Sequence, residues 1–450
     1  MRIGLVTLGC DKNTVDNEYL AGLLAKRGHA TVLAESTTDR YDAVVITTCG
    51  FIEAAKAQSM SEIDRWARAK RQHGRPRRLI LAGCLTQRYA EKILAAYPEI
   101  DGLAGVGHFE ALADLIEEAD PDSGEVCLAL CQKPAVQIER RLPRRRLTKR
   151  AHAYLKIADG CDHACSFCSI PLMKGRRHSV PAPIILAEAR ALLRQGIREL
   201  NLIAQDLSQY GGDLGPGAPR LPGLLRALAG LEGDFWLRLL YLYPGGVTEE
   251  LLERIATEPK ICRYLDIPLQ HLNRGVLKAM KRPWGQVRGD KLFERIRKAV
   301  PGVTLRTTFV VGFPGETDEA FEELLDGARR LRIDRVGAFL YSPQEGTAAY
   351  SMPNQVDPKL ASERYDRLMR TQAAIALELN QARVGGIERV LFEGRDRARR
   401  AALARSQAEA AEIDGSIFVK GAGPKRAGSF GRVRIVRADG YDLWAEATPH

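Results

Sequence analysis

Three cysteines lie within one short stretch of the chain: Cys161, Cys165 and Cys168 in GCDHACSFC. Cysteine thiolates hold iron–sulfur clusters, and a four-iron cluster normally takes four of them. This loop has the spacing to wrap around one cluster, but it supplies only three ligands. The fourth iron would stay open to a small molecule, as a catalytic zinc keeps one position for water or substrate. The pattern therefore predicts a cluster that binds a substrate or cofactor directly.

Two other interpretations of this loop are weaker. A zinc knuckle would need His163 as its fourth ligand, but His163 lies inside the loop, and zinc-binding cysteines usually come as C-x-x-C pairs. A ferredoxin-type electron carrier would need four cysteines in a tight run, which this spacing does not provide. We therefore favour the cluster with an open iron.

Three more cysteines each follow an apolar run that is typical of a buried strand: Cys10 in TLGC, Cys49 in TTCGF and Cys84 in LAGC. The carboxyl ends of parallel strands share one edge of a sheet, and ligands usually bind at that edge. Free cysteine is among the most buried residue types, so each of the three alone could be a core residue. Three of them at equivalent strand ends favour a second three-cysteine cluster.

The composition is that of a globular protein of two or three domains, with 450 residues of which 45% are hydrophobic. The nine cysteines favour metal ligation over disulfides, and Cys127, Cys131 and Cys262, which have no matching partners, are interpreted as core or incidental. Neither a signal peptide nor a membrane span is apparent, so we expect a cytosolic protein without a membrane partner. The formal net charge of +11 favours an acidic partner such as RNA or the ribosome, although many enzymes are basic.

Residues 1–138 alternate short apolar runs with amphipathic segments, a pattern that predicts a doubly wound parallel sheet. The expected strands lie in 2–10, 43–51 and 78–85, and the expected helices in 15–26, 52–70 and 88–96. Residues 139–150 then hold seven basic residues and one acidic residue. For this segment a solvated, flexible linker is favoured over a nucleic-acid-binding arm.

Residues 151–376 contain six further strand candidates, mostly separated by helical patterns, which implies parallel pairing. These candidates are 153–158, 199–206, 235–244, 264–268, 303–316 and 335–342. Six such units suit an incomplete (β/α) barrel that leaves one side open. A helical pattern runs over 358–384, and residues 377–450 are dominated by short strands with glycine turns, typical of a small all-β, OB-like barrel.

A C-x-x-x-C-x-x-C loop after the first strand of an incomplete (β/α) barrel resembles the radical S-adenosylmethionine (SAM) superfamily. The resemblance implies that the open iron chelates the amino and carboxylate groups of SAM. It also implies that an electron from the cluster splits SAM to give a 5′-deoxyadenosyl radical, which removes hydrogen from an unactivated carbon. In such enzymes the cofactor carries the difficult chemistry and the protein supplies position and exclusion of water.

Two three-cysteine sites ahead of a small β-domain resemble the methylthiotransferases over essentially the whole chain. The motifs that carry the resemblance are GCDKNTVDNE, TTCGFI, DGCDHACSFCSIP, IAQDLSQYG, LLYLYP, YLDIPLQH, LRTTFVVGFPGET and EIDG. Within the family, the chain is most similar to the branch that modifies an aspartate of small-subunit ribosomal protein S12. Relatives that modify tRNA usually carry PxQSGS where this chain has PLQH.

The resemblance implies an N-terminal methylthiotransferase domain in 1–138, a radical SAM domain in 151–376 and a TRAM domain in 377–450. It also implies two [4Fe-4S] clusters as cofactors and two uses of SAM. One SAM would methylate a sulfur on the cluster of Cys10, Cys49 and Cys84, and the other, on the second cluster, would give the radical that attacks the aspartate β-carbon. A sulfur donor and a reducing electron donor are implied partners, and no residue is expected to be an acid–base catalyst.

The same resemblance suggests SAM contacts. Gln205 and Asp206 follow the second barrel strand, where radical SAM enzymes hold the amino group of SAM, although they could be only a polar strand end. Gly312, Pro314 and Gly315 in GFPGE resemble the motif that flanks the SAM adenosine, but the sequence is also that of a tight turn. Val180 stands where the family commonly has an arginine, which puts substrate detail in doubt.

The C-terminal domain is expected to recognise the macromolecule. From Arg383 to the end there are thirteen basic and nine acidic residues and few aromatic ones, so the expectation leans towards a protein, with RNA contact possible. Two alternatives stay open. One is a tRNA adenosine methylthiotransferase with the same chemistry, and the other is a non-catalytic iron–sulfur or zinc RNA-binding module.

Overall fold

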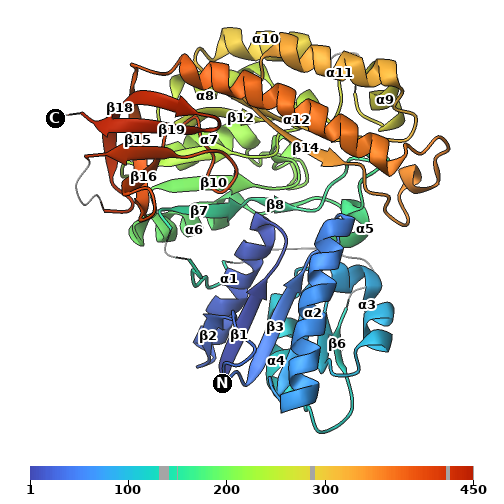
Figure 1. The fold of residues 1–450 in the computed structure, drawn as a ribbon. Helices are drawn as coiled ribbons and strands as arrows, with labels where there is room; N and C mark the ends of the chain where they lie inside the picture. Colours follow the sequence, from blue (N-terminus) through green and yellow to red (C-terminus); the bar gives the residue numbers. More distant parts are fainter. Residues whose placement is uncertain (131–140, 149, 284–288, 422–425, 449–450) are drawn as a thin grey trace. The chain divides into compact units, whose positions relative to one another are not determined.

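The computed structural model describes residues 1–130, 141–148, 150–283, 289–421 and 426–448 (Figure 1). The chain divides into two compact units, Met1–Lys149 with Lys156–Ile184 and Ser342–Tyr350, and Arg150–Leu155 with Ile185–Tyr341 and Ser351–His450. We refer to them as the first and second unit. None of the helices in the described ranges combines the length and the apolar character that crossing a membrane requires.

The first unit is built on a six-stranded sheet in the order β2-β1-β3-β4-β5-β6, with every neighbouring pair parallel. The strands are β1 (Arg2–Thr7), β2 (Ala30–Leu33), β3 (Ala43–Thr48), β4 (Arg78–Gly83), β5 (Gly102–Ala104) and β6 (Cys127–Ala129). Sequence analysis predicts β1, β3 and β4. It misses the other three, which have only three or four residues each and so lack a long apolar run.

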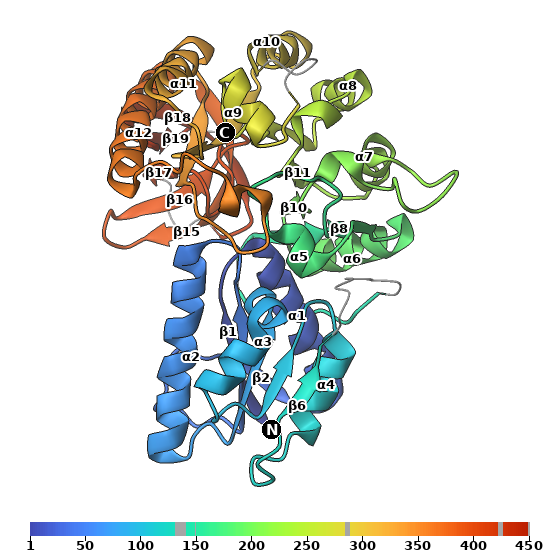
Figure 2. The same ribbon diagram turned by 90° about the vertical axis from the view of Figure 1, so that its right-hand side faces the viewer.

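Helices cover both faces of this sheet: α1 (Asp11–Lys26), α2 (Glu53–His73), α3 (Cys84–Ala96) and α4 (Phe109–Glu118). Successive strand residues point to opposite faces, so Val45 packs in the core with α1 and α4, and Val44 in the core with α2 and α3. Figure 2 shows α2 on one side of the sheet and α1 and α4 on the other. The predicted doubly wound parallel sheet is confirmed.

The cysteine loop that follows β7 (His152–Lys156) also belongs to the first unit. It lies between β8 (Ala158–Asp159) and the short helix α5 (Ile170–Lys174), and β8 pairs antiparallel with β9 (His178–Ser179).

The second unit contains another six-stranded sheet, in the order β14-β13-β12-β11-β10-β7. The strands are β7 (His152–Lys156), β10 (Glu199–Ile203), β11 (Trp236–Leu239), β12 (Ile261–Asp266), β13 (Thr304–Val311) and β14 (Arg335–Leu340). The pairings from β10 to β14 are parallel, and the sheet does not close on itself. The predicted incomplete barrel, with its six strands, is therefore confirmed.

Helices connect these strands, as Figure 1 shows: α6 (Ala182–Arg194), α7 (Leu221–Ala229), α8 (Glu249–Thr257), α9 (Arg274–Ala279), α10 (Gly289–Ala299), α11 (Asp318–Leu331) and α12 (Pro358–Gln381). Side-chain caps fix where several of them begin. The side chain of Thr317 accepts a hydrogen bond from the Ala320 amide at the start of α11, directly after GFPGE. Asp357 does the same for α12, whose first residue is Pro358.

The C-terminal strands form a closed barrel in the order β15-β16-β17-β19-β18, as predicted for an OB-like domain. They are β15 (Ile387–Asp396), β16 (Ala401–Arg405), β17 (Ile417–Lys420), β18 (Phe430–Asp439) and β19 (Asp442–Ala447). Sequence analysis misses β16, AALAR, because alanine has a low strand propensity. An apolar interior that includes Val390, Ile417 and Leu443 closes the barrel core.

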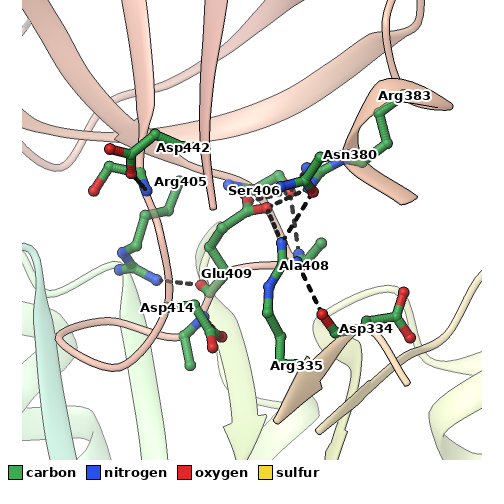
Figure 3. A network of polar contacts seen from close by, with 12 residues as sticks. Asp334, Arg335, Asn380, Arg383, Arg405, Ser406, Ala408, Glu409, Asp414 and Asp442 are labelled. Carbon is green, nitrogen blue, oxygen red and sulfur yellow. Dashed lines mark hydrogen bonds and ion pairs between the residues drawn. The ribbon is translucent and has the colours of Figure 1, made fainter. Parts of the chain in front are cut away.

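A buried polar network ties this barrel to the open sheet within the second unit (Figure 3). Glu409, in the loop after β16, accepts hydrogen bonds from Arg383 at 2.5 Å and from the Ser406 hydroxyl at 2.8 Å. Arg335, the first residue of β14, lies 3.4 Å from the same carboxylate. The two arginines lower the pKa of Glu409 to about 2 against the opposing effect of burial.

Arg405, the last residue of β16, and the loop that follows it make further contacts with strands of the open sheet. Arg405 pairs at 2.9 Å with Glu199, the first residue of β10, and Arg238 of β11 donates to the Gln407 carbonyl at 2.7 Å. The Tyr264 hydroxyl of β12 donates to Asp414 at 2.7 Å. Because Glu199 and Arg335 are the first residues of their strands, part of the C-terminal barrel lies at the amino-terminal edge of the open sheet.

Within the basic segment 139–150, part of the chain packs against α1, whereas Arg141, Arg145 and Arg150 are exposed. Arg144 forms a buried hydrogen bond of 2.7 Å with Glu18 of α1, and the Arg145 amide donates to the Glu18 carbonyl at 3.0 Å. Leu147 packs against the apolar core beside α1. The prediction of a solvated segment is wrong for Arg144 and Leu147, because α1 offers a buried carboxylate and an apolar core that charge counting along the chain does not reveal. Residues 139, 140 and 149 lie outside the described residues.

Candidate functional site

The three N-terminal cysteines lie at the carboxyl ends of three neighbouring strands. Cys10 stands at the start of α1, Cys49 directly follows β3, and Cys84 directly follows β4 and is the first residue of α3. Since β3 lies between β1 and β4, the three cysteine-bearing loops are adjacent at one edge of the sheet. Cys10 is exposed, whereas Cys49 and Cys84 are buried.

Close backbone approaches bring these loops together. Gly9 has a φ of +94°, and a Cβ at this position would lie 2.7 Å from the Cβ and 3.0 Å from the Sγ of Cys49. A Cβ on Gly50 would lie 3.0 Å from the Cα of Leu85 and 3.2 Å from the carbonyl carbon of Cys84. Only glycine fits between these loops, so the glycines beside Cys10 and Cys49 allow the cysteines to approach one another.

The environment of the buried thiols is mostly apolar but contains one nearby cation. Burial raises the pKa of the Cys84 thiol to about 12, and the positive charge of Lys174 opposes this rise. Burial likewise raises the pKa of Cys49. Hydrogen bonds fix the backbone of Cys49, because its amide donates to the Ser59 hydroxyl at 3.0 Å and its carbonyl accepts from that hydroxyl at 3.1 Å.

The second cysteine loop is half-buried and held by its neighbours in the first unit. The Cys161 amide donates to the Gly175 carbonyl at 3.1 Å, and the Cys168 amide donates to the Cys165 carbonyl at 3.1 Å. The Ser166 carbonyl accepts from the Ala349 amide at 2.8 Å. The bonds to Gly175 and Ala349 hold the loop against its neighbours in the first unit, and the bond between Cys168 and Cys165 closes a turn within the loop.

Helix α5 connects the two cysteine groups. It begins directly after Cys168 and Ser169, and its residues Ile170 and Met173 pack against Cys84. No group of three His, Cys, Asp or Glu side chains in the part of the chain that the structure describes is arranged to hold a single metal ion. A four-iron cluster makes a different demand, because each thiolate binds a different iron. Among the described residues, each of the two groups contributes three thiols, which fits two such clusters with one iron left open.

Asp206 and Gln205, the predicted contacts of SAM, lie just beyond the carboxyl end of β10 in the second unit. Asp206 accepts hydrogen bonds from the Ser208 amide at 2.8 Å, the Ser208 hydroxyl at 2.6 Å and the Tyr243 amide at 3.2 Å. It thereby caps a 3-10 helix, η1 (Leu207–Gln209), which is the structural alternative that sequence analysis left open. A contact of Gln205 or Asp206 with SAM stays a prediction.

The GFPGE loop follows β13 at the same edge of the open sheet. Gly312 has a φ of +78°, and a Cβ there would lie 2.6 Å from the Cβ of Ala361 in α12. Gly315 has a φ of +81°, and its amide donates to the Asn354 carbonyl at 2.9 Å. Both glycines, with Pro314 between them, are needed for the shape of this tight turn, whether or not it also holds SAM.

A buried charge network that sequence analysis missed supports this loop. Glu316 accepts hydrogen bonds from Arg364 of α12 at 2.8 Å and from the Gly312 amide at 3.2 Å. Its carboxylate also lies 3.3 Å from the Nε2 of His271, the histidine of PLQH, and both side chains are fully buried. The Nδ1 of His271 accepts from the Asn273 amide, which leaves the proton on Nε2, facing Glu316. His271 of the PLQH motif is therefore buried within the second unit, against Glu316.

Val180, at the position where the family commonly has an arginine, is buried beside the second cysteine loop. Its side chain is 5% exposed, and its amide donates to the Ile157 carbonyl at 2.8 Å. Of the other cysteines, Cys262 is fully buried in β12, and Cys127 packs partly against the core of the first unit. Cys131 lies outside the described residues.

Comparison with known proteins gives three matching families along the chain. Residues 2–105 match the Uncharacterized protein family UPF0004, residues 155–328 the Radical SAM superfamily, and residues 384–448 the TRAM domain. Among solved structures, the radical S-adenosylmethionine methyltransferase TsrM from Kitasatospora setae is similar in fold, with a TM-score of 0.58 at 14% identity over 78% of this chain and 77% of that chain. Fold and cysteine loop thus define a radical SAM protein with a TRAM domain.

Relatives that match over the full length of the chain show to which family of radical SAM proteins it belongs. The chain is 44% identical over 444 residues to the "Ribosomal protein uS12 methylthiotransferase RimO" of Desulforudis audaxviator, which covers 99% of this chain and 96% of the relative. It is 41% identical over 445 residues to the protein of the same name from Desulforamulus reducens, with 99% of both chains covered. The chain belongs to the RimO family of ribosomal protein uS12 methylthiotransferases.

Proposed function

We propose that this protein transfers a methylthio group to the β-carbon of an aspartate in small-subunit ribosomal protein S12. The observation that carries the proposal is the presence of two three-cysteine groups in one compact unit, joined by α5 packed against Cys84. Full-length similarity to proteins named for this activity supports the choice of substrate.

In this proposal Cys161, Cys165 and Cys168 hold one [4Fe-4S] cluster and Cys10, Cys49 and Cys84 hold the other. When bound, the clusters and SAM supply the electron, the methyl group and the radical chemistry. The chain's own part is to hold three thiolates in each group, to leave one iron position free of protein ligands, and to bury the thiols of Cys49 and Cys84 away from water.

Further parts of the proposal concern SAM and the macromolecular substrate. Gln205 and Asp206 would bind the amino end of SAM, and the turn of Gly312, Pro314 and Gly315 would flank its adenosine. The proposed domains are the methylthiotransferase domain in 1–138, the radical SAM domain in 151–376 and the TRAM domain in 377–450. The TRAM domain would bind the ribosomal protein and could also contact RNA. A sulfur donor and a reducing electron donor complete the reaction, and we propose a cytoplasmic location because ribosomes are assembled there.

The test is an anaerobic reaction of the reconstituted protein with SAM, a reductant and sulfide. Ribosomal protein S12 and bulk tRNA are offered in separate tubes, and mass spectrometry detects a methylthio gain. We expect the gain on one aspartate of S12 and none on tRNA. A gain on tRNA alone would support the proposed reaction but contradict S12 as its substrate. Bound zinc without labile sulfide would support a non-catalytic module instead.

A further inference from the structure

Four charged side chains form a buried cluster beside the N-terminal cysteines: Lys156, Lys174, Asp16 and Asp159. The Nζ atoms of Lys156 and Lys174 lie 3.2 Å and 3.1 Å from the same Asp159 oxygen. Asp16 of α1 pairs with Lys156 and lies 3.6 Å from the Nζ of Lys174. The side chains of Lys156, Lys174, Asp16 and Asp159 are 0%, 4%, 13% and 2% exposed, respectively. We call this group the charge quartet.

The charge quartet holds Lys174 in its charged form. Burial alone would remove the proton from a lysine, but Asp159 and then Asp16, together with Cys84 and Cys10, raise the pKa of Lys174 well above its usual value. Two lysines and two aspartates sum to zero, so the quartet can be buried without a net charge. The ammonium of Lys174 therefore remains positive where the cysteines can interact with it.

Lys174 faces the N-terminal cysteine group. It is the last residue of α5, and its neighbour Met173 packs against Cys84. Lys174 also lines a small cavity together with Asn13 and Gly83, which lie next to the loops of Cys10 and Cys84. The cysteines that contribute to raising the pKa of Lys174 are Cys84 and Cys10.

A cluster on three thiolates carries net negative charge, and a buried anion is costly unless a cation compensates it. We propose that Lys174 is a positioning residue: the quartet is neutral as a whole, but its Lys174 ammonium lies on the side of Cys84 and stabilises the negative charge of the iron–sulfur cluster held by Cys10, Cys49 and Cys84. This inference rests on the proposed function, because it takes these cysteines as cluster ligands. Its consequence is electronic: reduction adds one more negative charge, which the fixed ammonium stabilises, so Lys174 raises the midpoint potential of that cluster.

The experiment isolates the N-terminal cluster by using the Cys161→Ala/Cys165→Ala/Cys168→Ala triple variant as background. Into it we introduce Lys174→Gln, which removes the charge but keeps a hydrogen-bond donor towards Asp159, and separately Lys174→Arg, which keeps the charge. Lys156→Met is the matched control, because Lys156 contacts the same two carboxylates but belongs to β7 and is not among the residues that line the small cavity with Lys174. Iron and acid-labile sulfide are measured first, and then the midpoint potential by an anaerobic titration followed by electron paramagnetic resonance.

We expect Lys174→Gln to shift the midpoint potential to more negative values, Lys174→Arg to leave it near that of the background, and Lys156→Met to shift it less. In the reciprocal background that lacks Cys10, Cys49 and Cys84, Lys174→Gln should shift the potential of the remaining cluster less. An unchanged potential, or an equal shift with Lys156→Met, would overturn the role of Lys174 alone. If the first background binds no iron, the assignment of the N-terminal ligands fails, and this inference fails with it.

Discussion

Gly9→Ala offers a direct test of how the N-terminal cysteine site is assembled. A φ of +94° costs an alanine about 1–2 kcal/mol. The added Cβ would also lie 2.7 Å from the Cβ of Cys49, and overpacking of this kind costs about 1–3 kcal/mol. The sum of about 2–5 kcal/mol is below the typical folding free energy of about 5–15 kcal/mol, so we expect the fold to survive.

The N-terminal cysteine site of the Gly9→Ala protein is expected to lose its ability to hold a cluster. To restore an ordinary carbon–carbon contact, Cys49 must move by about 1 Å from its position in the structure. Metal–ligand distances tolerate only about 0.2 Å, so this displacement removes Cys49 as a ligand. Iron content should then fall from about eight atoms per chain to about four, since one of two four-iron clusters is lost. SAM cleavage should persist, and methylthiolation should stop.

Gly28→Ala is the matched control. Gly28 has a φ of +83°, but an added Cβ would meet nothing within 4 Å. It therefore carries the same backbone strain without the contact on Cys49, and it should keep both clusters and full activity. Iron analysis, SAM cleavage and methylthiolation of S12 are measured on both variants in parallel. If Gly9→Ala holds as much iron as Gly28→Ala and methylthiolates equally well, the reasoning about Cys49 is refuted.

The other predictions concern separate parts of the molecule. Cys161→Ala should abolish SAM cleavage, whereas Cys84→Ala should spare cleavage and abolish methylthiolation; the two activities are assayed separately, and a Cys84→Ala protein that still methylthiolates S12 contradicts the assignment. Glu409→Gln should lower the stability of the second unit by about 3 kcal/mol, because the pKa of Glu409 falls from 4.5 to about 2 on folding. In the unmodified protein this contribution is fully present above about pH 4.5 and is lost as the pH falls towards 2, so denaturant unfolding should show a larger difference between the two proteins at pH 7 than at pH 3. Gly312→Ala should weaken SAM binding, since its Cβ would lie 2.6 Å from that of Ala361, and Ala361→Gly should restore part of the loss in the double variant, as measured by calorimetric titration with SAM.

The elements with long apolar or periodic patterns could be predicted from sequence. The runs before Cys10, Cys49 and Cys84 indicate buried parallel strands, and the topology rule then brings their ends to one edge. What no local pattern reveals is how close the loops come, because the contact of Gly9 with Cys49 joins residues forty positions apart. The packing of α5 on Cys84 also cannot be predicted from the sequence, since a five-residue helix has too few residues to show a periodic apolar face.

The partners of buried charged residues could not be predicted from the sequence. Arg144 reads as a solvated linker residue, yet Glu18 binds it in the interior. Arg364 sits on a helix with many other charges, and nothing nearby in the chain marks it as the partner of Glu316. A pairing of this kind depends on which elements the fold brings together, so hydropathy and charge counts along the chain do not contain it.

The attachment of the TRAM barrel to the starts of the strands sets a fixed length inside the second unit. Strands of five to eight residues, such as β10 and β13, span about 15–25 Å at about 3.3 Å per residue. Under the proposed function, a substrate bound by the TRAM barrel must extend at least this far to reach Gln205 and Gly312 at the opposite edge. In that proposal the barrel sets a minimum substrate length, which a folded ribosomal protein meets and a single amino acid or nucleotide does not.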